Sequence, residues 1–243
     1  MIKKVVIAAA GQGTRMLHLT KNKSKHLINV LKKPFLAYLL DNLLEAGYKE
    51  LVLVVGHKRE RIEEFLKDYK NDFKIRLINQ FEVLGEKEYG TACVLKCVKD
   101  IVGKENFLVV YGDNFYSIED LKVFNIEDEY SYIAGFCHQK PEKYGVLKIK
   151  DGFLKKVIEK PKRHVGNLIN VGLYKFTPDI LEKISEIQLS ERGEYELTDA
   201  VNLLAKENKV KVKKIQDFWL DFGNPADIIR ASHFLKNNNK WKK

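Results

Sequence analysis

The chain of 243 residues is 45% hydrophobic, carries a net charge of +10 and contains three cysteines. Charged residues interrupt every apolar run well before the ~20 residues that a membrane-spanning helix needs, and an odd cysteine count argues against a disulfide framework. Four lysines at 236–243 supply four of the ten net charges and read as a solvated basic tail, which leaves about +6 for the body. The sequence has no stripe of basic residues interleaved with aromatic residues that would favour nucleic-acid binding. We therefore expect a cytoplasmic protein that binds neither membranes nor nucleic acid.

The first half of the chain alternates between strands and helices. The apolar spacing predicts strands at 4–10, 50–56, 75–79 and 107–111, and helices at 35–46, 60–72 and 91–98. We expect Gly47 to end the first of these helices. Near-continuous apolar strands separated by helices are typical of a parallel sheet that is covered on both faces. We predict an α/β protein with a Rossmann-like, doubly wound, mostly parallel sheet, in which ligands lie beyond the carboxyl ends of the strands.

The second half has a different pattern of shorter strands with turn signals between them. It predicts strands at 132–136, 145–149, 153–158 and 171–176, and helices at 179–187 and 197–207. Asp151 and Gly152 form the expected turn of a hairpin. No linker rich in proline or glycine separates the halves. We therefore predict one domain, 1–235, with a first lobe at 1–130 and a second, mixed-sheet lobe at 131–235.

A glycine-rich segment, Gly11-Gln12-Gly13-Thr14-Arg15-Met16, follows the first predicted strand. Glycine lets the backbone turn tightly and approach a ligand, and a row of amides in such a turn binds anions. Arg15 adds a guanidinium that fits phosphate oxygens, and Lys25 adds a second cation. The spacing matches neither a dinucleotide-binding fingerprint nor a P-loop. The loop alone leaves a plain turn open, and Lys25 tilts the interpretation towards a polyphosphate ligand.

Isolated carboxylates at strand ends are the next candidate site residues. Asp113 follows the strand at 107–111 and fits either a hard cation or a helix cap. Asp221 is a lone acid in an apolar stretch, where cation binding or a structural hydrogen bond would offset its burial. Glu159-Lys160 reads as a surface pair unless the strand bends there, and Pro161 makes such a bend plausible.

With these residues in place, the chain resembles the sugar-1-phosphate nucleotidyltransferases over about residues 2 to 232. Further motifs of that family follow the glycine loop in the family's order. They are Leu19-Thr20, Ser24-Lys25, Lys33-Pro34, Gly90-Thr91-Ala92, Gly112-Asp113-Asn114, Tyr144-Gly145-Val146, Glu159-Lys160-Pro161, Asn170-Val171-Gly172, Gly193-Glu194-Tyr195-Glu196-Leu197-Thr198-Asp199 and Trp219-Leu220-Asp221-Phe222-Gly223. The stretches Ser24-Lys25 and Arg192-Gly193-Glu194 look most like the glucose-1-phosphate thymidylyltransferase branch.

The resemblance implies an activity. A sugar 1-phosphate would attack the α-phosphorus of a nucleoside triphosphate, giving an NDP-sugar and pyrophosphate with Mg²⁺ as cofactor. It favours dTTP or UTP with glucose 1-phosphate, and it leaves a homo-oligomer open. A cytidylyltransferase for a non-sugar phosphate such as phosphocholine and a non-catalytic nucleotide-sugar-binding regulator remain as alternatives.

The resemblance also implies the site residues and divides the lobes into a nucleotide-binding lobe and a sugar-binding lobe. The catalytic cations are Arg15, Lys25 and Lys160, and the metal ligands are Asp113 and Asp221. The nucleotide contacts are Ala8, Ala10, Gly11, Gly13, Thr14, Arg15, Gln80 and Gly90, with Gln80 at the base edge and Gly90 leaving room for the ring. The sugar-phosphate contacts are Tyr144, Gly145, Glu159, Lys160, Asn170, Gly172, Glu194 and Trp219.

Overall fold

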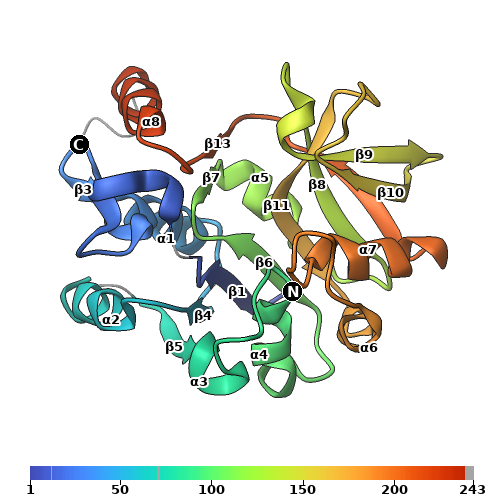
Figure 1. Cartoon of the computed structure of the whole chain (residues 1–243), viewed down its shortest axis with the longest axis horizontal. Coiled ribbons are helices and arrows are strands. Elements are labelled where there is room, and N and C mark those ends of the chain that lie inside the picture. Colours follow the sequence, from blue (N-terminus) through green and yellow to red (C-terminus); the bar gives the residue numbers. More distant parts are fainter. Residues whose placement is uncertain (12, 70–71, 239–243) are drawn as a thin grey trace.

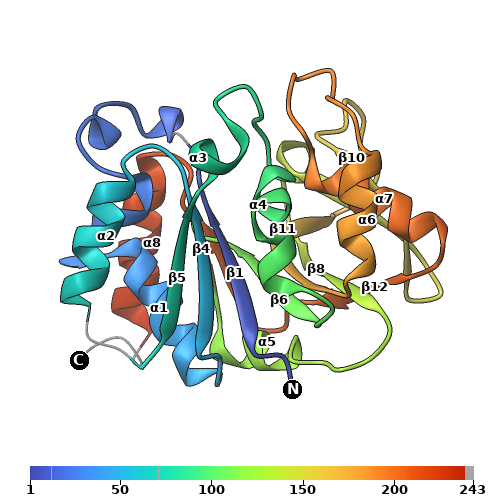
Figure 2. The same ribbon diagram turned by 90° about the horizontal axis from the view of Figure 1, so that it is seen from below.

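A computed structural model describes residues 1–11, 13–69 and 72–238. A nine-stranded sheet runs through both halves of the chain, with helices on both of its faces (Figures 1 and 2). Its strand order is β5-β4-β1-β6-β11-β8-β12-β10-β9. Figure 2 shows α1, α2 and α8 on one side of the sheet, with α4 and α6 on the other.

The first half forms the parallel part of the sheet. Its elements are β1 (Lys4–Ala9), η1 (Thr14–Thr20), η2 (Lys25–Leu27), β2 (Asn29–Val30), β3 (Lys33–Pro34), α1 (Phe35–Glu45), β4 (Glu50–Val55), α2 (Arg59–Asp68), β5 (Lys74–Asn79), α3 (Gln80–Leu84), α4 (Cys93–Val102), β6 (Phe107–Tyr111), β7 (Asn114–Tyr116) and α5 (Ile118–Val123). Strand β1 pairs in parallel with β4 and β6, and β4 pairs in parallel with β5. The predicted doubly wound fold is therefore confirmed.

Two predicted helix boundaries in this half need correction. The helix expected at 91–98 begins at Cys93 and continues to Val102, because the Ala92 amide is bound by the Tyr195 carbonyl at 2.9 Å and Gly103 ends the helix with a φ of 59°. The helix expected at 60–72 ends at Asp68. The predicted stop of α1 at Gly47 is confirmed, because this residue has the left-handed φ of 94° that glycine tolerates.

The second half extends the same sheet with several antiparallel strand pairs and one parallel pair. Its elements are β8 (Ser131–Cys137), η3 (Pro141–Lys143), β9 (Gly145–Lys150), β10 (Phe153–Glu159), β11 (Leu168–Phe176), α6 (Asp179–Glu186), α7 (Leu197–Lys206), β12 (Val210–Lys214), β13 (Trp219–Asp221) and α8 (Ala226–Asn237). Strand β11 joins the lobes by pairing with β6. Strand β9 pairs with both β10 and β11, so the second lobe closes on itself. The hairpin at Asp151 and Gly152 is confirmed, since both have positive φ.

Helix α8 replaces part of the predicted basic tail at 236–243. Lys236 lies inside the helix, because Ala231 and Leu235 of α8 are buried in a cluster with Phe35 of α1. In Figure 1 the helix lies close to β3 and to the end of β13. The remainder of that tail, 239–243, lies outside the described residues.

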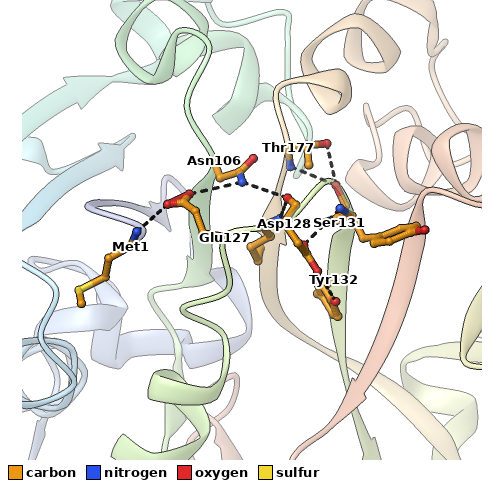
Figure 3. Close-up of polar contacts among 9 residues, drawn as sticks. Met1, Asn106, Glu127, Asp128, Ser131, Tyr132 and Thr177 are labelled. Carbon is orange, nitrogen blue, oxygen red and sulfur yellow. Dashed lines mark hydrogen bonds and ion pairs between the residues drawn. The ribbon is translucent and has the colours of Figure 1, made fainter.

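A polar network holds the segment before β8, which connects the lobes (Figure 3). The N-terminal amine of Met1 pairs with Glu127 at 2.7 Å, and the Asn106 amide donates to the Asp128 carbonyl at 3.2 Å. The Tyr132 hydroxyl donates to the Asp128 carboxylate at 2.7 Å.

Among the described residues, none of the helices combines the length and apolar character needed to cross a bilayer.

Candidate active site

A cavity of about 390 Å³ opens where the carboxyl ends of β1 and β6 meet loops of the second lobe. Most of the residues predicted from the sequence share this cavity, and their chemical roles stay predictions. Those that line it are Ala8, Ala10, Gly11, Arg15, Lys25, Gln80, Gly90, Asp113, Tyr144, Gly145, Glu159, Lys160, Asn170, Gly172, Glu194, Trp219 and Asp221. Gly13 and Thr14 do not line it.

The glycine loop leaves β1 and turns directly into η1. Gly13 has a left-handed φ of 68°, and a Cβ there would come within 3.2 Å of the side chains of Lys25 and Thr20. The Thr20 hydroxyl donates to the carbonyls of Gly13 and Leu17, which closes the turn. Gly13 therefore shapes the loop, whereas Gly11 and Arg15 line the cavity. Gln12 of the predicted motif lies outside the described residues.

Asp113 lies two residues after the end of β6, and its carboxylate is paired with a basic side chain. The Lys25 ammonium pairs with its Oδ2, and the Asn114 amide donates to its Oδ1 at 3.0 Å. Burial is the largest single effect and acts to raise the pKa of Asp113. The charge and hydrogen bond of Lys25, together with the smaller effects of His26 and the backbone, outweigh burial, so the pKa lies below its usual value. Burial and Lys25 together lower the pKa of the neighbouring His26 to about 3. The site therefore holds an ionised carboxylate beside a neutral imidazole at neutral pH.

Strand β13 brings Asp221 beside Asp113. Asp221 lies opposite Asn114 in the β7–β13 pair, and the Phe222 amide donates to the Asp113 carbonyl at 2.8 Å. The Asp221 carboxylate accepts from the Tyr144 hydroxyl at 3.2 Å and pairs with Arg230 of α8. Trp219, on the same strand, donates its indole N–H to the Asn114 side chain at 2.6 Å.

This pair of carboxylates fits Mg²⁺. In the described part of the chain, no group of three histidine, cysteine, aspartate or glutamate side chains is arranged to hold a metal. Mg²⁺ needs few protein ligands, since it takes its other oxygens from substrate phosphates and water. Asp113 and Asp221 on adjacent backbone segments of one cavity provide that kind of partial ligand set.

Glu159 and Lys160 both line the cavity although they are consecutive in the chain. Glu159 is the last residue of β10, and Lys160 has a left-handed φ of 41° that ends the strand alternation. The Lys160 amide donates to the Tyr144 carbonyl at 3.0 Å, which fixes the bend. The irregularity expected before Pro161 is therefore present. Burial raises the pKa of the Glu159 carboxyl above its usual value.

Asn170 and Gly172 form an irregular segment of β11 under the cavity. Gly172 has a φ of 70°, and a Cβ there would come within 2.5 Å of the Tyr111 ring. The Asn170 side chain donates to the Tyr174 hydroxyl at 2.7 Å and accepts from the Gly172 amide at 3.1 Å. Both ends of this amide are therefore engaged by the protein itself, and a contact of Asn170 with a sugar stays a prediction.

The long segment before Gly90 contains the short helix α3, which the sequence did not predict. Gln80 begins α3 and is 1% exposed, and its amide donates to the Glu88 carbonyl at 3.3 Å. Gly90 has a φ of 131°, and a Cβ there would come within 2.3 Å of the Tyr195 carbonyl oxygen. Glycine is required at this position because of the Tyr195 backbone, a reason the sequence did not indicate.

Several cavity residues were given no role from the sequence. They include Tyr89, Thr91, Tyr111, Lys143, Arg192, Glu196 and Thr198. The Arg192 guanidinium pairs with the buried Glu196 carboxylate, with its Nε at 3.0 Å. Arg192 belongs to the matched stretch Arg192-Gly193-Glu194, so its charge within that stretch was an available signal. Lys143 directly precedes the Tyr144 motif.

Comparisons with known proteins give matches over nearly the whole chain. The family model described as nucleotidyl transferase matches residues 4–238. A bifunctional sugar-1-phosphate nucleotidylyltransferase/acetyltransferase of Sulfurisphaera tokodaii is 34% identical over 97% of this chain, which spans only 56% of that protein. The UTP–glucose-1-phosphate uridylyltransferase AglF of Haloferax volcanii is 34% identical, with 96% of each chain covered.

Solved structures show the same fold. A UDP-glucose pyrophosphorylase complexed with UDP-glucose superimposes with a TM-score of 0.85 at 24% identity, covering 98% of this chain and all of that one. A glucose-1-phosphate thymidylyltransferase from Bacillus anthracis, described as putative, gives a TM-score of 0.83 at 24% identity, with 98% and 97% covered. From the family model and its relatives, the chain belongs to the nucleotidyl transferase family.

Proposed function

We propose that this protein transfers a nucleotidyl group from a nucleoside triphosphate to a sugar 1-phosphate and releases pyrophosphate. One observation carries the proposal. A single cavity holds the Asp113–Asp221 carboxylate pair, with the cations Arg15 and Lys25 contributed by the first lobe and Lys160 by the second. Two sets of phosphate-binding cations around a carboxylate pair are what a reaction between two phosphorylated substrates requires.

The reaction needs positioning and charge neutralisation more than covalent help from the protein. Lys160 would hold the sugar phosphate so that one of its oxygens attacks the α-phosphorus in line with the leaving pyrophosphate. Arg15 and the Gly11 backbone would bind the β- and γ-phosphates that leave, and Lys25 would offset charge at the α-phosphate. Asp113 and Asp221 would hold Mg²⁺, which supplies further charge neutralisation when it is bound.

Glu159 and the β11 segment around Gly172 would accept and orient the sugar. Glu159 is ionised when the pH exceeds its raised pKa, and a carboxylate accepts hydrogen bonds from sugar hydroxyls. Residues of both lobes line the cavity, so the two substrates would lie between the lobes.

For the base, we favour UTP or dTTP, together with glucose 1-phosphate. The Gln80 amide is committed to the Glu88 carbonyl, which leaves its side-chain oxygen as an acceptor. Uracil and thymine present an N3–H donor, whereas cytosine presents an acceptor at N3. The relative AglF is named as a uridylyltransferase for glucose 1-phosphate, which supports the same choice.

Pyrophosphate release from a panel of substrates tests the proposal. The four common nucleoside triphosphates and dTTP would each be mixed with glucose 1-phosphate or with phosphocholine, in the presence of Mg²⁺. We expect release with glucose 1-phosphate and UTP or dTTP. Release only with CTP and phosphocholine would indicate the cytidylyltransferase alternative. Nucleotide-sugar binding with no release from any pair would indicate a regulator.

Gln80→Ala tests the base assignment separately. We expect the preference for UTP or dTTP over purine triphosphates to fall by about 1–3 kcal/mol, because the base edge loses its partner. Gln139→Ala, at an exposed position outside the cavity, is the matched control. An unchanged preference in the Gln80 variant would remove this residue from base recognition.

A further inference from the structure

Helix α8 contributes a cation to the site that no sequence motif indicated. The Arg230 guanidinium pairs with the Asp221 carboxylate through Oδ1 and donates to the Asp221 carbonyl at 2.9 Å. Arg230 comes from the far end of the chain and approaches Asp221 from the α8 side, whereas Lys25 approaches Asp113. Each predicted metal ligand therefore has a basic partner within the protein itself.

Asp227 holds Arg230 in position. Asp227 is 5% exposed, and its Oδ1 forms an ion pair with the Arg230 guanidinium at 3.1 Å. Its Oδ2 accepts from the amides of Gly223 at 2.8 Å and Asn224 at 2.9 Å, so it also fixes the turn that follows Asp221. A buried carboxylate that organises both the turn and the guanidinium distinguishes this contact from an ordinary surface ion pair, which contributes little.

Both oxygens of the Asp221 carboxylate are engaged in this state. Oδ1 is bound by Arg230 and Oδ2 by the Tyr144 hydroxyl at 3.2 Å. A divalent cation that binds Asp221 must therefore compete with the Arg230 guanidinium. In the absence of a metal, Arg230 and Lys25 offset the repulsion between two carboxylates that lie on adjacent backbone segments.

We propose that the Arg230 guanidinium acts as a counter-ion of Asp221 and is displaced from this carboxylate when the metal binds. Metal binding would then weaken the contact between α8 and β13. This inference rests on the metal pair of the proposed function. It assigns Arg230 a role in metal affinity: the free metal binds weakly, and the phosphates of the nucleotide supply the negative charge that favours loading. Arg230 is a positioning residue and makes no contact with the reacting atoms in this role.

The affinity for Mn²⁺ in the absence of substrates tests this role, measured by titration calorimetry or electron paramagnetic resonance. Mn²⁺ serves as the probe for the Mg²⁺ site. We expect Arg230→Met to bind Mn²⁺ roughly 3- to 10-fold more tightly, because it removes a competing charge. Arg230→Lys keeps the charge but lacks the planar guanidinium, so its affinity for Mn²⁺ should lie between those of the wild type and Arg230→Met. Arg61→Met, which removes a surface partner of Glu64 on α2, is the matched control.

The same titration separates this inference from the metal site itself. If Asp113→Asn and Asp221→Asn lose Mn²⁺ binding while Arg230→Met binds as the wild type does, or more weakly, the role of Arg230 is wrong. If both asparagine variants bind Mn²⁺ with wild-type affinity, the proposed metal pair is wrong.

Amide hydrogen exchange of the wild-type protein gives a test that needs no change at Arg230. We expect the amides of 226–237 to exchange several-fold faster when Mn²⁺ is saturating, and Asp221→Asn to show no such response. Equal protection of α8 with and without saturating Mn²⁺ would overturn the proposed coupling.

Discussion

Two charged clusters at opposite ends of β6 and β11 use similar residues in different ways. At the amino end of β6, the Lys175 ammonium is fully buried and donates to the Asp128 carboxylate at 3.0 Å, the Asp128 carbonyl at 2.7 Å and the Tyr130 carbonyl at 2.5 Å. At the carboxyl end, the side chains of Asp113 and Asp221 remain 23% and 26% exposed and face the cavity.

The difference lies in whether partners can be exchanged. All three ammonium hydrogens of Lys175 have acceptors, so removing this side chain takes a buried charged donor from Asp128 and from the Tyr130 carbonyl. The carboxylates at the cavity are partly exposed, so under the proposed function a ligand would be able to replace the cations that they hold. Charge pairs of one kind would then stabilise the fold at one end and serve a binding site at the other.

The largest expected effect is on catalysis, at the cavity cluster that contains Asp113 and Asp221. Asp113→Asn and Asp221→Asn should each lower turnover by at least about 100-fold, because each removes a metal ligand and its charge. Pyrophosphate release at limiting Mg²⁺ measures turnover, and circular dichroism should show the fold retained. Asp100→Asn, on the exposed face of α4, is the control. A near-normal rate in either site variant would contradict the metal assignment.

Changes in the buried cluster around Lys175 should lower the stability of the fold instead. Lys175→Met should lower the free energy of unfolding by about 2–4 kcal/mol, because Asp128 and the two carbonyls lose a buried charged donor. Turnover per folded molecule should stay unchanged, since Lys175 does not line the cavity. Urea titration measures the change, with the exposed Lys155→Met as control. A loss of turnover without a loss of stability would erase the distinction between the clusters.

Within the cavity, the two lobes should affect different substrates. Arg15→Ala should weaken use of the triphosphate, and Lys160→Ala should weaken use of the sugar 1-phosphate. Each should cost about 1.5–3 kcal/mol, the range for a hydrogen bond to a charged group. Separate KM titrations of both substrates measure the effects. Equal damage to both substrates in both variants would show that the lobes do not divide the substrates in this way.

The smallest effect concerns the pH dependence set by Glu159. Burial raises the pKa of this carboxyl, against smaller opposing effects of Thr198 and Arg192. As the pH falls through that raised pKa, Glu159 is protonated and the KM for the sugar 1-phosphate should rise. In Glu159→Gln this acidic limb should be absent, although the KM is higher throughout. An identical pH profile in the variant would contradict a role for the Glu159 charge.

The same pKa shift predicts how stability changes with pH. A carboxyl whose pKa is raised on folding binds its proton more tightly in the folded state, so its ionisation costs stability as the pH rises above the usual carboxyl value. Glu159→Gln should therefore gain stability relative to the wild type above that value and none below it. Unfolding titrations at two pH values measure the difference.

The sequence determined the local features of this protein. Strand and helix periods, the Gly47 stop and the hairpin turn at Asp151 and Gly152 depend on neighbouring residues, so they could be predicted without a structure. The order of the family motifs placed most of the cavity residues in advance. It gave no role to Arg192, which lies in a matched stretch, or to Lys143, which directly precedes a matched motif. It also missed α8, whose buried residues depend on a partner, Phe35, that lies far away in the chain.

Tertiary structure decided the contacts that join distant segments. Asp113 and Asp221 become neighbours only because β7 pairs with β13, and Arg230 reaches Asp221 only because α8 packs across the end of that pair. The need for glycine at Gly90 likewise comes from the Tyr195 backbone. The periodicity of apolar residues along a helix or strand indicates which of its faces is buried. It does not indicate which distant element covers that face. Most of the charges at the cavity could therefore be identified from the sequence, whereas the partner of each charge was set by packing.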